Sequence, residues 1–250
     1  MLENYDYPNY PFFSGTGFFA IFPPYEYIFY ITAKHCFAKC SDNKFTEKLE
    51  IPYEYSSLEK TSKFQNQAII FSEYLTMKYT EQDNDYEDIL IFIVDNSISQ
   101  EKKEILKERA LTLQHQEEID QILSHLCSIN GNIRTVGFPG TSKDINYDDA
   151  SSNIQPRGYF GKISKTSKFK NMYGFESPSW KENIYNGFSG SPILEIMPIK
   201  KQNGTLSIEA IPIGILITAT KTRGEFLSIN VATNLIASYI VEKLKANKTE

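Results

Sequence analysis

Ser189 lies in the segment NGFSGSP, residues 186–192, directly before the strand-like pair at residues 193–194. Glycine adopts backbone conformations that other residues avoid, so a tight turn here can direct the N–H groups of Gly187 and Ser189 into one cavity. Two such donors stabilise the oxyanion that forms when a serine hydroxyl attacks a carbonyl group. The segment therefore favours a serine nucleophile with an oxyanion hole, although Gly-x-Ser-Gly is also a common loop sequence.

His35 is the candidate base that such a nucleophile needs, because a serine hydroxyl reacts poorly near neutral pH. It lies in ITAKHC, residues 31–36, where the strand-forming run YEYIFYIT ends. A histidine at a strand end, on a turn with small residues, is placed to face a cleft. The other two histidines, His115 and His125, lie in a polar helical stretch and are typical of solvated surface residues.

Asp88 is a candidate for the acid that orients the imidazole of the base. It precedes the apolar run ILIFIV, residues 89–94, and a carboxylate at the edge of a buried strand can fix the tautomer of a histidine. The alternative is that Asp88 is an exposed carboxylate at the start of a strand, without a role in catalysis. Asp83, Asp85 and Glu87 fit that description equally well, so the residues alone leave the choice of acid open.

Three segments together resemble the signature segments of chymotrypsin-like serine proteases. They are TAKHC at 32–36, DILI at 88–91 and GFSGSP at 187–192, in the family's order of His, Asp and Ser. The resemblance singles out Asp88 as the acid and implies a catalytic triad of His35, Asp88 and Ser189. It also implies an oxyanion hole formed by the N–H groups of Gly187 and Ser189.

Further segments are similar to the bacterial branch of that family, the glutamyl endopeptidases and HtrA-type proteases. SGTGF at 14–18 resembles the strand before the histidine segment, and VGFPG at 136–140 resembles a Gly-Tyr-Pro-Gly turn of those enzymes. Residues 213–215 and 225–230 resemble their last strand pair. No PDZ-sized segment follows the closing helix, and no Ile-Val-like activation site lies near the start, so we do not expect activation by a new amino terminus.

The resemblance also places the residues that would bind substrate. Asn183 is expected at the base of the S1 pocket, with Ile184 and Gly224 near its walls. Leu216 stands where the glutamyl endopeptidases carry a histidine, and none of the four is an acid that would pair with Lys or Arg. We therefore expect an uncharged P1 residue.

The stretch Ile217, Thr218 and Ala219 is expected to offer a strand edge to which an extended peptide adds by main-chain hydrogen bonds. Cys36 is expected to be a buried thiol, because residues 14–31 contain no cysteine that could pair with it. A metal site at His35, Cys36 and Cys40 would lack a fourth ligand and would consume the base. No Gly-rich phosphate loop is present, so we expect no cofactor.

Two β-rich blocks must position these residues. Each consists of short runs rich in Phe, Tyr and Ile between turn residues, which predicts strands. The runs cover residues 15–22, 25–32, 67–75 and 88–94, and then 132–138, 158–164, 191–196, 209–218 and 225–231. Successive β blocks suggest two barrels or sandwiches, and the resemblance implies an all-β fold of two tandem six-stranded antiparallel β-barrels.

A helical stretch separates the two blocks, and a second helix closes the chain. Ile119, Ile122, Leu123 and Leu126 recur at helical spacing with one apolar face, and a similar stripe follows residue 233. We expect these faces to pack on the β blocks. A further hypothesis places a regulatory protein partner on the insert at 101–127.

The chain of 250 residues is thus expected to form one peptidase domain in four parts. They are a first barrel at 10–97 with His35 and Asp88, a helical insert at 98–127, a second barrel at 128–232 with Ser189, and a closing helix at 233–250.

Composition excludes several other classes of function. A net charge of −5 argues against general binding of nucleic acid or anionic membranes, and no apolar stretch is long enough to span a bilayer. Three cysteines and no signal peptide indicate the cytoplasm. We expect a serine endopeptidase that acts on protein or peptide substrates. The alternative is a latent, protease-like module that binds peptides without cleaving them.

Overall fold

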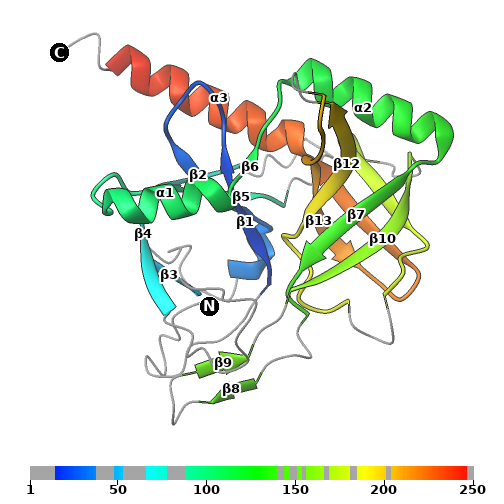
Figure 1. Cartoon of the computed structure of the whole chain (residues 1–250), viewed down its shortest axis with the longest axis horizontal. Coiled ribbons are helices and arrows are strands. Elements are labelled where there is room, and N and C mark those ends of the chain that lie inside the picture. Colours follow the sequence, from blue (N-terminus) through cyan, green and yellow to red (C-terminus); the bar gives the residue numbers. More distant parts are fainter. Residues whose placement is uncertain are drawn as a thin grey trace.

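Two β regions follow one another along the chain (Figure 1). The computed structural model describes residues 15–37, 48–52, 66–77, 88–139, 144–146, 151–153, 156–165, 169–180, 185–200 and 204–246. The first region is an open mixed sheet and the second is a closed barrel. Three α-helices pack against them, as Figure 1 shows.

The open sheet contains six described strands, and one of its two middle strands is buried along its whole length. Their order is β3 (Lys48–Pro52), β4 (Asn66–Thr76), β5 (Leu90–Val94), β2 (Ile28–Thr32), β1 (Gly17–Ile21) and β6 (Leu111–Thr112). Every residue of β5 is buried, as expected for a strand of sequence LIFIV that is covered on both faces. Neighbouring strands are antiparallel except β1 and β6, which pair in parallel.

The expectation of two closed barrels and an all-β fold is wrong. Among the described residues only the second region closes into a barrel, and with the helices the molecule is of the α/β class. Leu111 and Thr112 of the insert form β6, which pairs in parallel with Ala20 and Ile21 of β1. This short strand occupies the edge of the sheet at which a further antiparallel strand would be needed to close a barrel. Strand-forming runs predict strands, but closure depends on pairing between distant segments, which local sequence does not specify.

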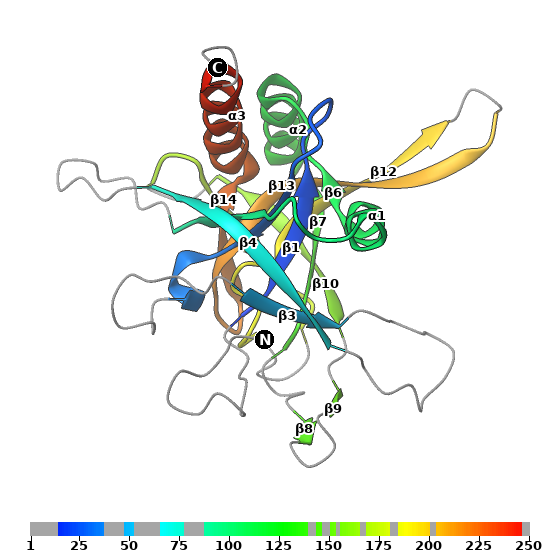
Figure 2. The ribbon, with the colours of Figure 1, turned by 90° about the vertical axis from the view of Figure 1, so that its left-hand side faces the viewer.

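The second region is a closed antiparallel barrel of six strands. Their order is β10 (Arg157–Ser164), β11 (Met172–Glu176), β14 (Arg223–Ser228), β13 (Leu206–Ala219), β12 (Pro192–Lys200) and β7 (Asn132–Gly137). Phe175, Phe188 and Phe226 are fully buried in its core. The ends of β12 and β13 extend beyond the barrel as a two-stranded ribbon (Figure 2). β8 (Asp144–Asn146) and β9 (Ser151–Asn153) form a separate small sheet.

The predicted insert contains two helices with β6 between them. α1 (Gln100–Arg109) begins at Ser99, whose hydroxyl accepts a hydrogen bond from Lys102 N–H, and packs on β1 and β2. α2 (Gln116–Ile129) packs on α3, β10 and β13. Its expected apolar face is the packed one, with Ile119, Leu123 and Leu126 buried and Ile122 half-buried. A protein partner on this insert would therefore meet its polar face.

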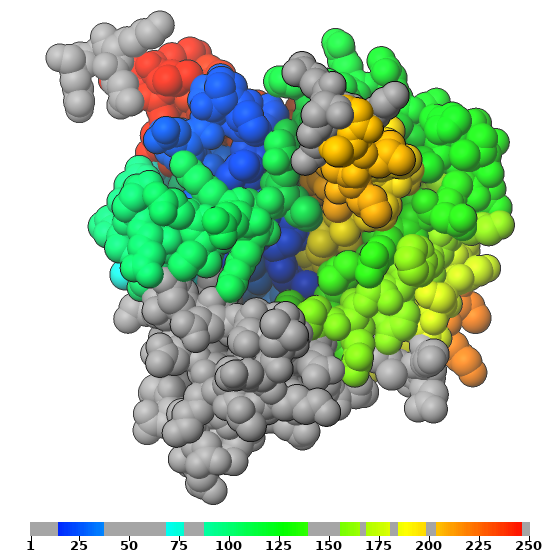
Figure 3. Space-filling view, viewed as in Figure 1, coloured from blue at the N-terminus to red at the C-terminus, as the bar shows by residue number. Residues whose placement is uncertain are grey.

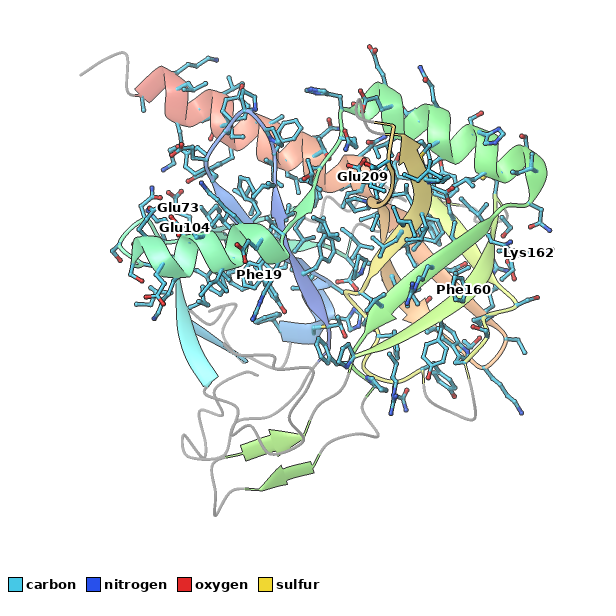
Figure 4. The ribbon with its side chains drawn as sticks, viewed as in Figure 1. Phe19, Glu73, Glu104, Phe160, Lys162 and Glu209 are labelled. Carbon is cyan, nitrogen blue, oxygen red and sulfur yellow. The ribbon has the colours of Figure 1, made fainter. Side chains whose placement is uncertain are left out.

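The closing helix α3 (Ile229–Ala246) begins earlier than expected, so the run at 225–231 is a strand only as far as Ser228. Its apolar side chains Ile236 and Ile240 are buried. Lys243 Nζ and Tyr239 Oη both donate hydrogen bonds to Glu73 Oε1 of β4, at 2.5 and 3.2 Å. Figure 4 labels Glu73, through which α3 is tied to the open sheet.

Within the described residues, no helix combines the length and the apolar character needed to cross a membrane.

Candidate active site

His35 lies on a short 3-10 turn, Lys34–Phe37, directly after β2. β2 pairs with β5 so that Thr32 faces Leu90, which places the residues after Thr32 beside those before Leu90. The backbone N–H of Lys34 donates to the carbonyl of Asp88 at 3.4 Å. Ordinary strand pairing within one sheet therefore brings His35 and Asp88 together.

Both carboxylate oxygens of Asp88 contact His35. The backbone N–H of His35 donates to Oδ1 at 2.9 Å, and the ring Nδ1 forms a hydrogen bond with Oδ2. Asp88 is 4% exposed, whereas the side chain of His35 is 42% exposed. The buried carboxylate thus fixes the ring through Nδ1 and leaves Nε2 for a second partner. The other acidic candidates, Asp83, Asp85 and Glu87, lie outside the described residues.

The contact with Asp88 changes the acidity of the imidazole. Hydrogen bonds of the ring with Asp88, which has the larger effect, and with Cys36 raise the pKa of His35 from its usual 6.5 to about 10. The raised pKa favours the protonated ring, which must lose this proton before it can accept one from another group.

The segment that carries Ser189 is a tight turn at the edge of the barrel. Gly187 and Gly190 have φ angles of 92° and 86°, which L-residues with side chains rarely adopt. Gly190 N–H donates to Leu216 O at 2.7 Å, and the fully buried Phe188 packs with its ring centroid 6.0 Å from that of Trp180. The turn is thus held both by β13 and by the aromatic core.

The two predicted oxyanion donors are free to bind a ligand. Within the described part of the chain, the N–H groups of Gly187 and Ser189 have no hydrogen-bond acceptor, although both residues are only half-buried. Buried backbone N–H groups in proteins are normally paired, and a half-buried N–H without a protein partner is open to water or a ligand. Two unpaired donors, two residues apart on a turn with left-handed glycines, are the arrangement that an oxyanion requires.

The turn of Ser189 packs directly on the segment of His35. Ser189 O accepts hydrogen bonds from Thr16 N–H at 2.8 Å and from Cys36 Sγ at 3.5 Å. A Cβ on Gly190 would lie 2.0 Å from Thr16 O and 2.5 Å from Thr32 Oγ1, so no other residue fits here. The two regions meet near the middle of the face in Figure 3, where blue atoms of the first strands adjoin yellow atoms of the barrel.

The hydroxyl of Ser189 does not point its proton at the imidazole. It donates to Ile217 O at 3.1 Å. Ile217 is the extra residue of a β-bulge, because the pairing of β13 with β14 shifts between Leu216 and Thr218. Bulges redirect backbone groups, and this one directs a carbonyl toward the serine. Among the described residues no hydrogen bond joins Ser189 Oγ to the ring of His35, so a proton transfer between them would require the hydroxyl to leave Ile217 O.

The predicted substrate residues fall into three groups. Asn183 and Ile184 lie outside the described residues. Leu216 is fully buried, and its Cδ1 would be 3.0 Å from a Cβ on Gly224, so the two residues are neighbours but Leu216 presents no surface to a substrate. The third group is residues 217–219, the expected strand edge.

The edge at residues 217–219 is open on one side. β12 pairs with β13 only as far as Ile215, while β14 continues to pair as far as Ala219. In the described part of the chain, one side of residues 217–219 therefore has no strand neighbour. Thr218 is exposed and Ala219 half-buried, whereas the side chain of Ile217 is buried. An extended peptide can add to this side.

Two further expectations concern sulfur and metals. Cys36 carries a buried thiol, in agreement with the sequence, and Cys40 lies outside the described residues. Over the described ranges, no group of three or more His, Cys, Asp and Glu side chains gathers as metal ligands would.

Sequence reasoning missed Thr16 as a residue of this site. It lies between two glycines in the segment at 14–18, which predicted only a strand with small residues. A small polar residue between glycines is the one local signal that it carries, because its contacts lie far away along the chain.

No protein-family model matches the chain, and comparison with curated proteins also gave no match. Inferences about function therefore depend on the geometry of the site.

Proposed function

We propose that the chain is a serine endopeptidase in which Ser189, His35 and Asp88 act together. One observation carries the proposal: the serine turn of the barrel packs on the turn of His35, whose ring is fixed by a buried carboxylate. A structural role alone would not require an oriented imidazole on the turn that contacts the serine turn, together with two N–H groups that have no partner in the described part of the chain. The order of the three residues, and their resemblance to chymotrypsin-like serine proteases, support the same reading.

In the proposed reaction, Ser189 Oγ attacks the carbonyl carbon of the scissile peptide bond while Nε2 of neutral His35 accepts the hydroxyl proton. The N–H groups of Gly187 and Ser189 donate to the oxyanion of the tetrahedral intermediate. His35 then passes the proton to the leaving amine, which departs as the new amino terminus and leaves an acyl group on Ser189. Water, deprotonated by His35, hydrolyses that ester and restores the serine.

Substrate is proposed to bind as an extended strand along residues 217–219. Its main chain would occupy the open side of β13, next to Ser189. We retain the proposal that the P1 residue is uncharged, and that the protein acts on polypeptides in the cytoplasm.

The test is digestion of a mixture of unstructured peptides, followed by mass spectrometry of the products. We expect internal cleavage by the wild-type protein and none by Ser189→Ala. Ser97→Ala is the matched control, because Ser97 lies on an exposed turn after β5, remote from the barrel. Cleavage that persists in Ser189→Ala would exclude Ser189 as the nucleophile.

A second candidate function, a peptide-binding module without activity, is favoured by one specific observation. The hydroxyl of Ser189 donates to Ile217 O and not to His35, so the free protein is not in the reactive state. The same peptide mixture distinguishes the two. A binding module would retain peptides equally in the wild type and in Ser189→Ala, and neither protein would cleave them.

A further inference from the structure

Thr16 lies immediately before β1, is 3% exposed, and connects the two β regions through four hydrogen bonds. Its N–H donates to Ser189 O at 2.8 Å, and its hydroxyl donates to Gly187 O at 2.7 Å. The hydroxyl also accepts from Phe138 N–H at 3.0 Å, and the carbonyl accepts from Thr32 Oγ1 at 2.7 Å. Three of these bonds reach the barrel, and the fourth reaches the last residue of β2.

The two bonds to the serine turn constrain the peptide group that carries an oxyanion donor. A peptide group is planar, with its C=O and N–H directed oppositely. The carbonyls of Gly187 and Ser189 are both held toward Thr16. The peptide group between them carries the N–H of Ser189. With its two neighbours held, this group has little freedom to rotate.

Gly187 is the residue of the turn that most needs such a restraint. Glycine adopts a φ of 92° without steric cost, but it also adopts many other backbone conformations because it has no side chain. Rotation at Gly187 would turn an oxyanion donor away from the substrate. The hydroxyl of Thr16 holds the carbonyl of the same residue and opposes that rotation.

The bond from Thr32 connects the same residue to the base. Thr32 ends β2, three residues before His35, and its buried hydroxyl donates to the carbonyl of Thr16. Thr16 therefore fixes the serine turn relative to the strand that leads into the histidine turn.

We propose that Thr16 is a positioning residue of the active site, whose hydroxyl holds the oxyanion donors of the serine turn in place. This inference rests on the proposed function. It goes beyond the triad, because Thr16 precedes a strand of the open sheet but acts through Gly187 and Ser189, which belong to the barrel region.

The test is the rate constant with which a fluorophosphonate probe labels Ser189, measured across a range of pH. Thr16→Val keeps the shape of the side chain and removes the hydroxyl, and we expect it to lower the rate constant about tenfold. The pH midpoint should not move, because the bonds of Thr16 go to residues other than His35 and Asp88. Thr16→Ser keeps the hydroxyl and should recover most of the rate.

Thr233→Val is the matched control. Thr233 is also buried, and its hydroxyl donates to Ile229 O at 3.2 Å within α3, away from the serine turn. We expect it to label at the wild-type rate. If circular dichroism shows that Thr16→Val is unfolded, Thr16→Ala, which adds no methyl group beside polar atoms, replaces it with the same expected loss.

The outcomes separate this inference from the proposed function. Labelling of the wild type and of Thr16→Val at equal rates overturns the inference alone. Equal losses in Thr16→Val and Thr16→Ser overturn it as well, because the hydroxyl would then not be responsible. A wild-type protein that does not label at Ser189 overturns the proposed function, and this inference with it.

Discussion

The open sheet and the closed barrel hold their parts of the site in different ways. In the open sheet, Asp88 and His35 are brought together by the backbone pairing of two neighbouring strands, β5 and β2. In the barrel, the turn of Ser189 is anchored on β13 but also needs contacts from the other region, through Thr16 and Cys36. The proposed acid and base are thus brought together within one sheet, and the proposed nucleophile is held by contacts across the junction.

This difference predicts that some substitutions should affect the serine turn alone and others the pair of His35 and Asp88 alone. Damage at the junction should displace the serine turn while His35 and Asp88 stay paired. Damage to the pair should leave the serine turn in place but without a base. The predictions below use the rate of fluorophosphonate labelling at Ser189 and the stability of the fold.

The largest effect is expected from loss of the base. His35→Ala should lower the labelling rate by about 10⁴-fold or more, because no group then accepts the proton of Ser189. His125→Ala is the matched control, since His125 is exposed on α2. A labelling rate in His35→Ala within tenfold of the wild type would show that the base lies elsewhere.

Asp88→Asn should have the next largest effect and should also change the pH dependence. The base works only when neutral, so labelling should increase with pH, and the raised pKa of His35 places the midpoint above 6.5 in the wild type. Removing the carboxylate removes the largest cause of that shift, so the midpoint should move down toward 6.5. The maximal rate should fall by about 10³- to 10⁴-fold, because the tautomer is no longer fixed.

The control for this variant is on the same strand. Asp95 follows the other end of β5 and bonds to Ser97 N–H, so Asp95→Asn removes a carboxylate without touching the site. It should change neither the midpoint nor the maximal rate. An unchanged midpoint in Asp88→Asn would mean that Asp88 does not set the acidity of His35.

Gly190→Ala tests the junction itself, with a smaller effect. An alanine at position 190 would have to adopt a positive φ of 86°, and its Cβ would clash with Thr16 O. The free energy of unfolding should therefore fall by about 2 to 4 kcal/mol. Gly204→Ala is matched in φ at 82° but has nothing within 4 Å, so it should cost only about 1 kcal/mol. Urea denaturation measures both, and equal losses would show that packing at the junction contributes nothing.

Local sequence predicted most of the strands and the residues of the proposed site, but only part of the fold. The local residues pointed to His35 and Ser189, whereas only the resemblance selected Asp88, which the structure places against His35. The alternation in residues 132–138 also matches the buried positions Ile133 and Thr135 of β7. These features depend on neighbours in the sequence, which is why they are visible there.

Other features depend on distant pairings and were missed. β6 is two residues long and has no periodic pattern, so its parallel pairing with β1 could not be foreseen, and neither could the open form of the sheet. The hydroxyl of Thr16 reaches a carbonyl 171 residues away. The bulge at Ile217, which directs a carbonyl at Ser189, is likewise a property of strand register.

The most direct test of the central claim is labelling of the purified protein by a fluorophosphonate probe, with the adduct located by mass spectrometry. An assembled nucleophile predicts a single adduct at Ser189 that is absent from Ser189→Ala and that forms faster as the pH is raised through the pKa of His35. A folded wild-type protein that gives no adduct at Ser189 at any pH up to about 10, the raised pKa of His35, would contradict the claim that the barrel and the open sheet together form a catalytic site.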